Sequence, residues 1–190
     1  MVFDLPTAVE FGGREWAIET DYRQVLRVLA AYEDPDLSDA EKVMVCLYNL
    51  YVDFEEIPRE QLQAAYDAAT AFIDNGNVGE QGPRTMDWTQ DAALIFPAVN
   101  KAAGFEVRGV PYMHWWTFLG LFMEIKDSVY STVLGLRQTR ARGKKLEKWE
   151  KEYWAQNRRL CELRPRYTED ELAEQARLEA ILGGGSQGTM

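Results

Sequence analysis

The segment 112–125 constrains this chain most, because ten of its fourteen residues are apolar or aromatic. It includes the adjacent pair Trp115 and Trp116. So much apolar surface must be hidden inside the protein, against another protein or in a membrane. The run is shorter than the roughly 20 residues that a membrane-spanning helix needs, and Glu124 and Lys126 close it. We therefore expect no membrane span and interpret the segment as a buried central helix, apolar nearly all round.

The remaining pattern predicts a mainly α fold, a multi-helix bundle with a small N-terminal β-hairpin. Alternating apolar residues flank Gly12-Gly13, which suits a two-residue hairpin turn. Apolar residues at helical spacing predict further helices. These are expected over about 22–32, over 38–54 after a capping box of Ser38 and Glu41, over 58–73, from about Met86 with a kink at Pro97, and over 129–137.

The rear of the chain carries a second pattern. Apolar positions step by three and four residues along Leu146, Trp149, Tyr153, Gln156, Leu160 and Leu163. This spacing predicts one long helix with a coiled-coil-like seam. The expected parts are therefore a hairpin over 1–20 packed on the bundle, a helical core over 21–137, a basic long helix plus a C-terminal helix over 138–182, and a flexible tail over 183–190.

Charge is unevenly distributed along the 190 residues, whose net charge is −10. Residues 1–100 carry 6 basic and 19 acidic side chains, whereas residues 101–190 carry 15 basic and 12 acidic ones. Within the second half, 137–166 holds 11 basic against 4 acidic side chains. Such polarity steers a partner or favours head-to-tail self-association.

Few residues suggest catalysis or metal binding. His114 is the only histidine, which removes most nucleophile–base and zinc arrangements. It lies about 15 Å along a helix from Glu124, so we interpret it as part of a thin polar side with Thr117 and Gly120. The two cysteines lack metal-ligand spacing, and no phosphate loop or dinucleotide fingerprint is present. We expect no enzyme activity, no cofactor and no metal site.

The basic stretch 137–151 leaves three interpretations open. It contains Arg137, Lys144 and Lys145, with Trp149 and Trp154 nearby. It is a solvated helix face, a contact for a protein partner, or a nucleic-acid contact through phosphates and stacked bases. Interleaved glutamates and the acidic chain count against nucleic acid.

The chain also resembles a known family over roughly 5–165. The similarity is carried by Leu5-Pro6-Thr7-Ala8-Val9-Glu10, Ile18 to Arg23, Gln90-Asp91-Ala92, His114-Trp115-Trp116-Thr117-Phe118, Leu134-Gly135-Leu136-Arg137, Lys144-Lys145-Leu146 and Glu150 to Tyr153. These segments are similar to bacteriophage tail-module proteins of long-tailed phages and prophages of Gram-positive hosts. The basic linker 137–145 and the residues after 167 depart from that pattern.

The resemblance implies a non-enzymatic tail assembly chaperone in the cytoplasm of the bacterial host. Such chaperones bind the tape-measure protein, keep it soluble while the major tail protein polymerises around it, and are typically left out of the virion. Self-association is a further expectation. Alternatives are a tail-completion or connector component of the virion, and a nucleic-acid-binding regulator acting through 137–151. The expected core or partner-contact residues are Trp115, Trp116, Phe118, Phe122, Trp149, Tyr153, Trp154, Arg137, Lys144 and Lys145.

Overall fold

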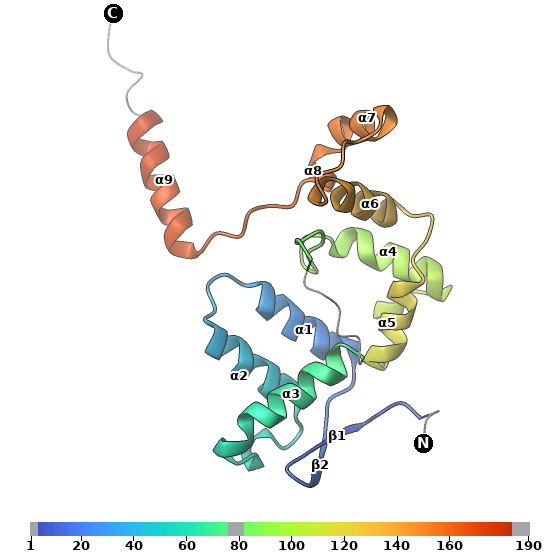
Figure 1. The fold of residues 1–190 in the computed structure, drawn as a ribbon, viewed down its shortest axis with the longest axis vertical. Helices are drawn as coiled ribbons and strands as arrows, with labels where there is room; N and C mark the ends of the chain where they lie inside the picture. The colour runs from blue at the N-terminus through green and yellow to red at the C-terminus, as the bar shows by residue number, and fades with distance from the viewer. Residues whose placement is uncertain (1–3, 76–81, 184–190) are drawn as a thin grey trace, which may run out of the picture.

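The computed structural model describes residues 4–75 and 82–183, and it confirms a mainly α fold with an N-terminal β-hairpin (Figure 1). The hairpin consists of β1 (Ala8–Phe11) and β2 (Arg14–Ala17). The helices are α1 (Tyr22–Glu33), α2 (Asp39–Leu50), α3 (Leu62–Ile73), α4 (Ala92–Ala103), α5 (Trp115–Met123), α6 (Val129–Ala141), α7 (Lys148–Gln156), α8 (Arg158–Cys161) and α9 (Glu169–Gly183). Three short 3₁₀ turns are η1 (Phe54–Glu56), η2 (Arg59–Gln61) and η3 (Val107–Gly109).

The hairpin is antiparallel, with Val9 opposite Trp16. Gly12 and Gly13 both have positive φ angles, as the two-residue turn requires. Phe11 stacks on Trp16 with ring centroids 5.2 Å apart, and both rings belong to the main core. The hairpin therefore packs on the helices through one face, which is what stabilises so small a sheet.

Helix α1 follows its predicted bounds, whereas α2 starts as predicted but ends at Leu50, four residues before the predicted end at Phe54, which lies in η1. Asp21 caps α1 by accepting from the Arg23 backbone N–H, and Ser38 and Glu41 form the predicted capping box of α2. Val25, Val28, Leu47 and Leu50 are fully buried between these helices and their neighbours. The capping signals and the 3.6-residue periodicity are local, so they were legible from sequence.

The fourth helix starts at Ala92, six residues after the predicted Met86. The Asp87 carboxylate accepts the backbone N–H groups of Thr89 and Gln90, which holds residues 88–91 in turns. An aspartate that binds nearby N–H groups competes with helix formation. Pro97 lies inside α4 as expected, and Gly104 ends the helix with φ of 78°.

The predicted long helix over 146–163 is wrong, because the chain breaks at Asn157 into α7 and α8. The Tyr153 carbonyl accepts both the backbone N–H and the side-chain amide of Asn157, whose φ of −117° and ψ of 35° end α7. Helix α6 and α8 share a second small core of Val133, Leu136 and Cys161. The coiled-coil-like seam therefore does not form.

The C-terminal helix α9 lies apart from α6–α8 (Figure 1). Its start carries a capping box, in which Thr168 and Glu171 bind each other reciprocally. The Glu169 backbone N–H also donates to Asp36 Oδ1, at 2.8 Å. Of the tail predicted over 183–190, Gly183 is the last residue of α9, and the rest lies outside the described residues.

Candidate functional site

The His-Trp-Trp block joins the start of α5 to the end of α3. Trp115 Nε1 donates to the Ile73 carbonyl at 2.7 Å, and Trp116 Nε1 donates to the Phe72 carbonyl at 2.8 Å. The last carbonyls of a helix have no partner inside the helix. The two indoles therefore satisfy the end of α3, which gives both tryptophans a structural task.

His114 was expected to lie on a thin polar side of the helix with Thr117 and Gly120. It is instead buried and caps the start of α5. Its Nδ1 accepts from the Trp116 backbone N–H, and its Nε2 lies 2.9 Å from the Pro6 carbonyl oxygen. Nδ1 is thus an acceptor and Nε2 donates to Pro6, the neutral tautomer that serves both contacts. Thr117 and Gly120, by contrast, are exposed.

The helix α5 is buried on one side only. Among its residues, Trp115 and Phe118 are fully buried. Phe118 stacks on Tyr22 of α1 at 4.4 Å, and Phe122 tilts against Trp88 at 4.9 Å. Met123 is 64% exposed. The apolar segment is therefore divided between the core and a partly open surface, rather than hidden on all sides.

An apolar groove of about 360 Å³ lies where α1, α4 and α5 meet. Tyr22, Ile95 and Phe118 are its deepest side chains, since all three are almost fully buried. The other uncharged residues that line the groove are Leu26, Ala30, Trp88, Thr89, Ala92 and Phe96. Its charged residues are Arg23, Arg27 and Arg108. The groove thus combines an aromatic floor with a cationic rim.

A second, shallower apolar hollow surrounds Trp116. It measures about 440 Å³ and is lined by Val9 of the hairpin, Ala68 and Phe72 of α3, and Pro6. Phe72 stacks on Trp116 with ring centroids 5.8 Å apart. Trp116 is the tryptophan of the pair that keeps part of its surface open.

The basic stretch does not act as one surface, because Arg137 is buried with 5% of its area exposed. Its guanidinium binds Asp91 of α4 instead of facing solvent, which corrects its place among the expected contact residues. Lys144 and Lys145 are exposed in the loop between α6 and α7. A contact with phosphates or a partner through this stretch would use those lysines and not Arg137.

The three aromatic residues of the predicted seam have different surroundings. Tyr153 and Trp154 pack on the small core of α6 and α8, and Arg140 lies 4.3 Å over the Trp154 ring. Trp149 is 58% exposed. Trp149 is therefore the available anchor among them.

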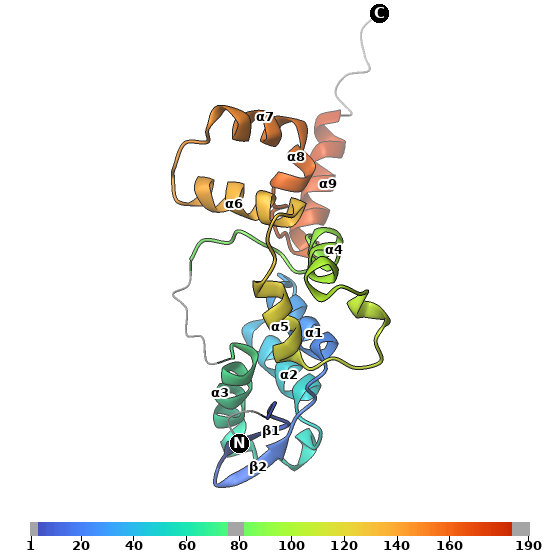
Figure 2. The same ribbon diagram turned by 90° about the vertical axis from the view of Figure 1, so that its right-hand side faces the viewer.

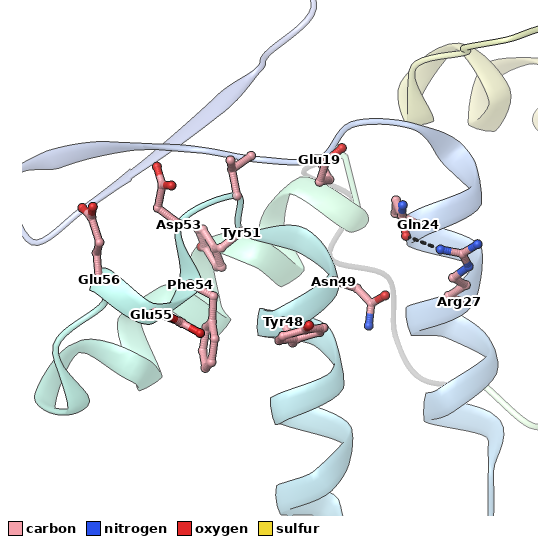
Figure 3. Close-up of a pocket in the computed structure, with 11 residues that line it drawn as sticks. Glu19, Gln24, Arg27, Tyr48, Asn49, Tyr51, Asp53, Phe54, Glu55 and Glu56 are labelled. Atoms are coloured by element: carbon pink, nitrogen blue, oxygen red, sulfur yellow. Dashed lines mark hydrogen bonds between the residues drawn. The ribbon is translucent and has the colours of Figure 1, made fainter.

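A third hollow, of about 630 Å³, lies between the start of α1, the end of α2 and η1 (Figure 3). Its carboxylates are Glu19, Asp53, Glu55 and Glu56, and its one cation is Arg27. We call it the acidic pocket. The pocket was not predicted from sequence, because residues before α1, at the end of α2 and in η1 form it together. Tyr48 of α2 and Val52, which follows α2, line it and are exposed.

Ion pairs connect α1, the turn before α4 and the C-terminal segment. Arg166 binds Glu33 of α1 at 2.9 Å and Asp87 at 3.2 Å, and Arg84 also pairs with Asp87. Burial and the charge of Asp87 raise the pKa of Glu33. Burial alone would raise the pKa of Asp87. The Gln90 N–H, Arg84 and Arg166 outweigh this effect, so the pKa of Asp87 is lower than its ordinary value. These groups form a structural network rather than a cleft that binds substrate.

Within residues 4–75 and 82–183, no three His, Cys, Asp or Glu side chains gather closely enough to hold a metal ion. None of the helices in that part combines the length and the apolar character that crossing a bilayer needs. Both cysteines are buried and free.

The fold and these surfaces define a mainly α-helical protein with exposed apolar and charged hollows. A family model described as "Bacteriophage Gp15 protein" matches residues 2–163, and the chain belongs to this family of bacteriophage proteins. A search of curated proteins and a search of solved structures each found no match. The resemblance expected from sequence is thereby confirmed at the level of a bacteriophage family.

Proposed function

We propose that this protein is a tail assembly chaperone that binds a helical segment of the tape-measure protein in the groove between α1 and α4. The observation that carries the proposal is the floor of that groove, where Tyr22 and Phe118 stack. An amphipathic helix that lays its apolar face into such a groove is a recurring mode of recognition. Binding there would cover apolar surface on both partners in the host cytoplasm, where tails are built.

The rim of the groove suits a helix with acidic flanks. Arg23 already pairs with Asp21, and Arg108 pairs with Glu106. Arg27 donates to Gln24 Oε1 at 2.8 Å and is exposed, so its guanidinium is accessible to a carboxylate. The arginines would set the orientation of the client, while the apolar floor would supply most of the affinity.

Co-expression with the tape-measure protein of the same genome tests the proposal. The soluble yield of the tape-measure protein should rise, and the two proteins should elute together. Ala92→Glu places a carboxylate inside the groove, and we expect it to weaken the complex at least about tenfold because a charge would be buried without a partner.

Ala93→Glu is the matched control, since Ala93 is exposed in the same turn of α4 and does not line the groove. It should bind like the unmodified chain. An unchanged soluble yield without a complex, or equal binding by both variants, would refute the assignment.

The alternative is a structural component retained in the tail. The opposite charges of the two ends of the chain favour it, because ordered assemblies use complementary ends. Mass spectrometry of purified virions separates the two functions. A chaperone should be absent or scarce there, whereas a tail component should be present in fixed proportion to the major tail protein.

A further inference from the structure

The acidic pocket has both charge and exposed apolar surface. Tyr48 is 72% exposed and Val52 is 55% exposed, and both line the pocket. Tyr48 makes an edge contact with Phe54 at 6.2 Å, so its ring is held in place. Exposed apolar groups beside carboxylates, of which Glu56 already pairs with Arg14, favour a partner that is cationic and aromatic.

The loop between α6 and α7 has the complementary composition. The exposed cations from the last turn of α6 to the end of α7 are Arg140, Arg142, Lys144, Lys145, Lys148 and Lys151. None of them forms an ion pair with another described residue of the chain. The exposed Trp149 directly follows Lys148.

The loop also has a defined shape. Gly143 has φ of 69°, and the Lys144 N–H donates to the Thr139 carbonyl at 3.1 Å, which closes a turn at the end of α6. The turn presents Lys144 and Lys145 to solvent. A preformed loop loses less entropy on binding than a flexible one.

The pocket and the loop lie far apart on one molecule. In Figures 1 and 2, α7 lies in the upper part of the long axis, whereas the end of α2 lies in the lower half. One chain therefore does not fill its own pocket, but a second copy placed along the same axis can.

We propose that the acidic pocket of one copy receives the basic loop 142–148 and Trp149 of the next copy. The contact is heterologous, because the two copies use different surfaces. Each bound copy therefore still offers a free pocket or a free loop, and the chain of copies grows. This proposal concerns self-association and does not depend on the tape-measure protein.

The first test is the dependence of assembly on salt. Without any client, the protein should form a concentration-dependent series of oligomers at about 0.01 M ionic strength, where the Debye length is about 30 Å, and monomers at about 1 M, where it is about 3 Å. Analytical ultracentrifugation measures both. A monomer at every concentration in low salt would overturn the proposal.

The decisive test uses two charge-reversed variants. Asp53→Lys with Glu55→Lys makes the pocket basic, and Lys144→Glu with Lys145→Glu makes the loop acidic. Each variant alone then has like charges at both ends and should be monomeric. An equal mixture should assemble again, because each reversed end meets its complement on the other variant.

The control reverses two exposed carboxylates elsewhere, Glu60→Lys with Glu174→Lys. It has the same net charge as the pocket variant and should assemble like the unmodified chain. Assembly by either end-reversed variant alone, or a mixture that stays monomeric, would overturn the proposal. Circular dichroism shows that each variant is folded.

Discussion

Arg137 of α6 forms a bidentate ion pair with Asp91 at the start of α4, with Nη1–Oδ2 at 2.6 Å and Nη2–Oδ1 at 2.9 Å. The same guanidinium donates to the carbonyls of Thr85, Leu160 and Cys161. These contacts use all five donors of an arginine. One buried side chain thus fixes α6 and α8 to the turn before α4.

Removal of that guanidinium should be costly. Arg137→Ala leaves the Asp91 carboxylate buried without its charge partner, and such losses cost about 3–5 kcal/mol of unfolding free energy. Urea denaturation followed by circular dichroism measures the change. Arg142→Ala, which alters an exposed arginine, should stay within about 0.5 kcal/mol. A loss below about 1 kcal/mol for Arg137→Ala would contradict the structural role assigned to it.

The indole groups of Trp115 and Trp116 should matter through their N–H donors. Trp115→Phe removes the indole donor to the Ile73 carbonyl, at a cost of about 1–3 kcal/mol. Trp116→Phe should cost less, because the Phe72 carbonyl still accepts from the Asn75 backbone N–H. The loss should be larger at Trp115, because it is buried and a cavity adds to it. Trp149→Phe is the exposed control and should change stability little. Equal effects at all three positions would refute the capping role.

Two glycines should respond in opposite directions to alanine. Gly104 has φ of 78° at the end of α4, so Gly104→Ala should destabilise by about 1 kcal/mol. Gly135 lies inside α6, and a Cβ added there meets open space. Gly135→Ala should therefore stabilise by about 0.5–1 kcal/mol. Thermal unfolding of the two variants measures both changes. A shift of Tm in the same direction for both would contradict the positions described for Gly104 and Gly135.

The stability of the protein should fall in acid partly through Asp87. The pKa of Asp87 is lower in the folded chain than its ordinary value of 3.8. The carboxylate therefore stabilises the fold above its unfolded pKa, and this contribution is lost as the pH falls through the lowered folded pKa. Asp87→Asn should make the unfolding free energy lower at neutral pH and less steeply dependent on pH in the range below about 4.

Glu33 provides the control of opposite sign. The pKa of Glu33 in the folded chain is raised above 4.5, chiefly by burial. Ionisation of Glu33 therefore lowers the unfolding free energy as the pH rises through this raised pKa. Glu33→Gln should steepen the acid-induced loss of stability instead of flattening it. Chemical denaturation across a pH series measures both slopes, and the same change of slope in both variants would contradict these directions.

Local signals in the sequence predicted the elements that depend on neighbours in the chain. The hairpin follows from Gly12-Gly13, and α2 follows from the capping box of Ser38 and Glu41. The aromatic segment was also placed correctly at the core through Trp115 and Phe118. Such features are fixed by backbone geometry and periodicity within a few residues.

The errors arose where distant residues decide the structure. The seam over 146–163 has helical spacing, but Asn157 ends α7 so that α8 can pack on α6. Arg137 belongs to a basic run in the sequence, and only its contact with Asp91, 46 positions earlier, explains why it is buried. The acidic pocket could not be predicted for the same reason, since it forms only when α1, α2 and η1 meet.

The pairing of the starts of α1 and α5 has a consequence for synthesis on the ribosome. The Trp115 N–H donates to the Thr20 carbonyl, and the Tyr22 N–H donates to the Met113 carbonyl. The segment near position 20 therefore cannot form these hydrogen bonds until a segment more than ninety residues later in the chain has been synthesised. At about 5–20 residues per second, that delay lasts several seconds. During this interval the nascent chain exposes the apolar faces of α1–α3, which makes it a candidate for host chaperones.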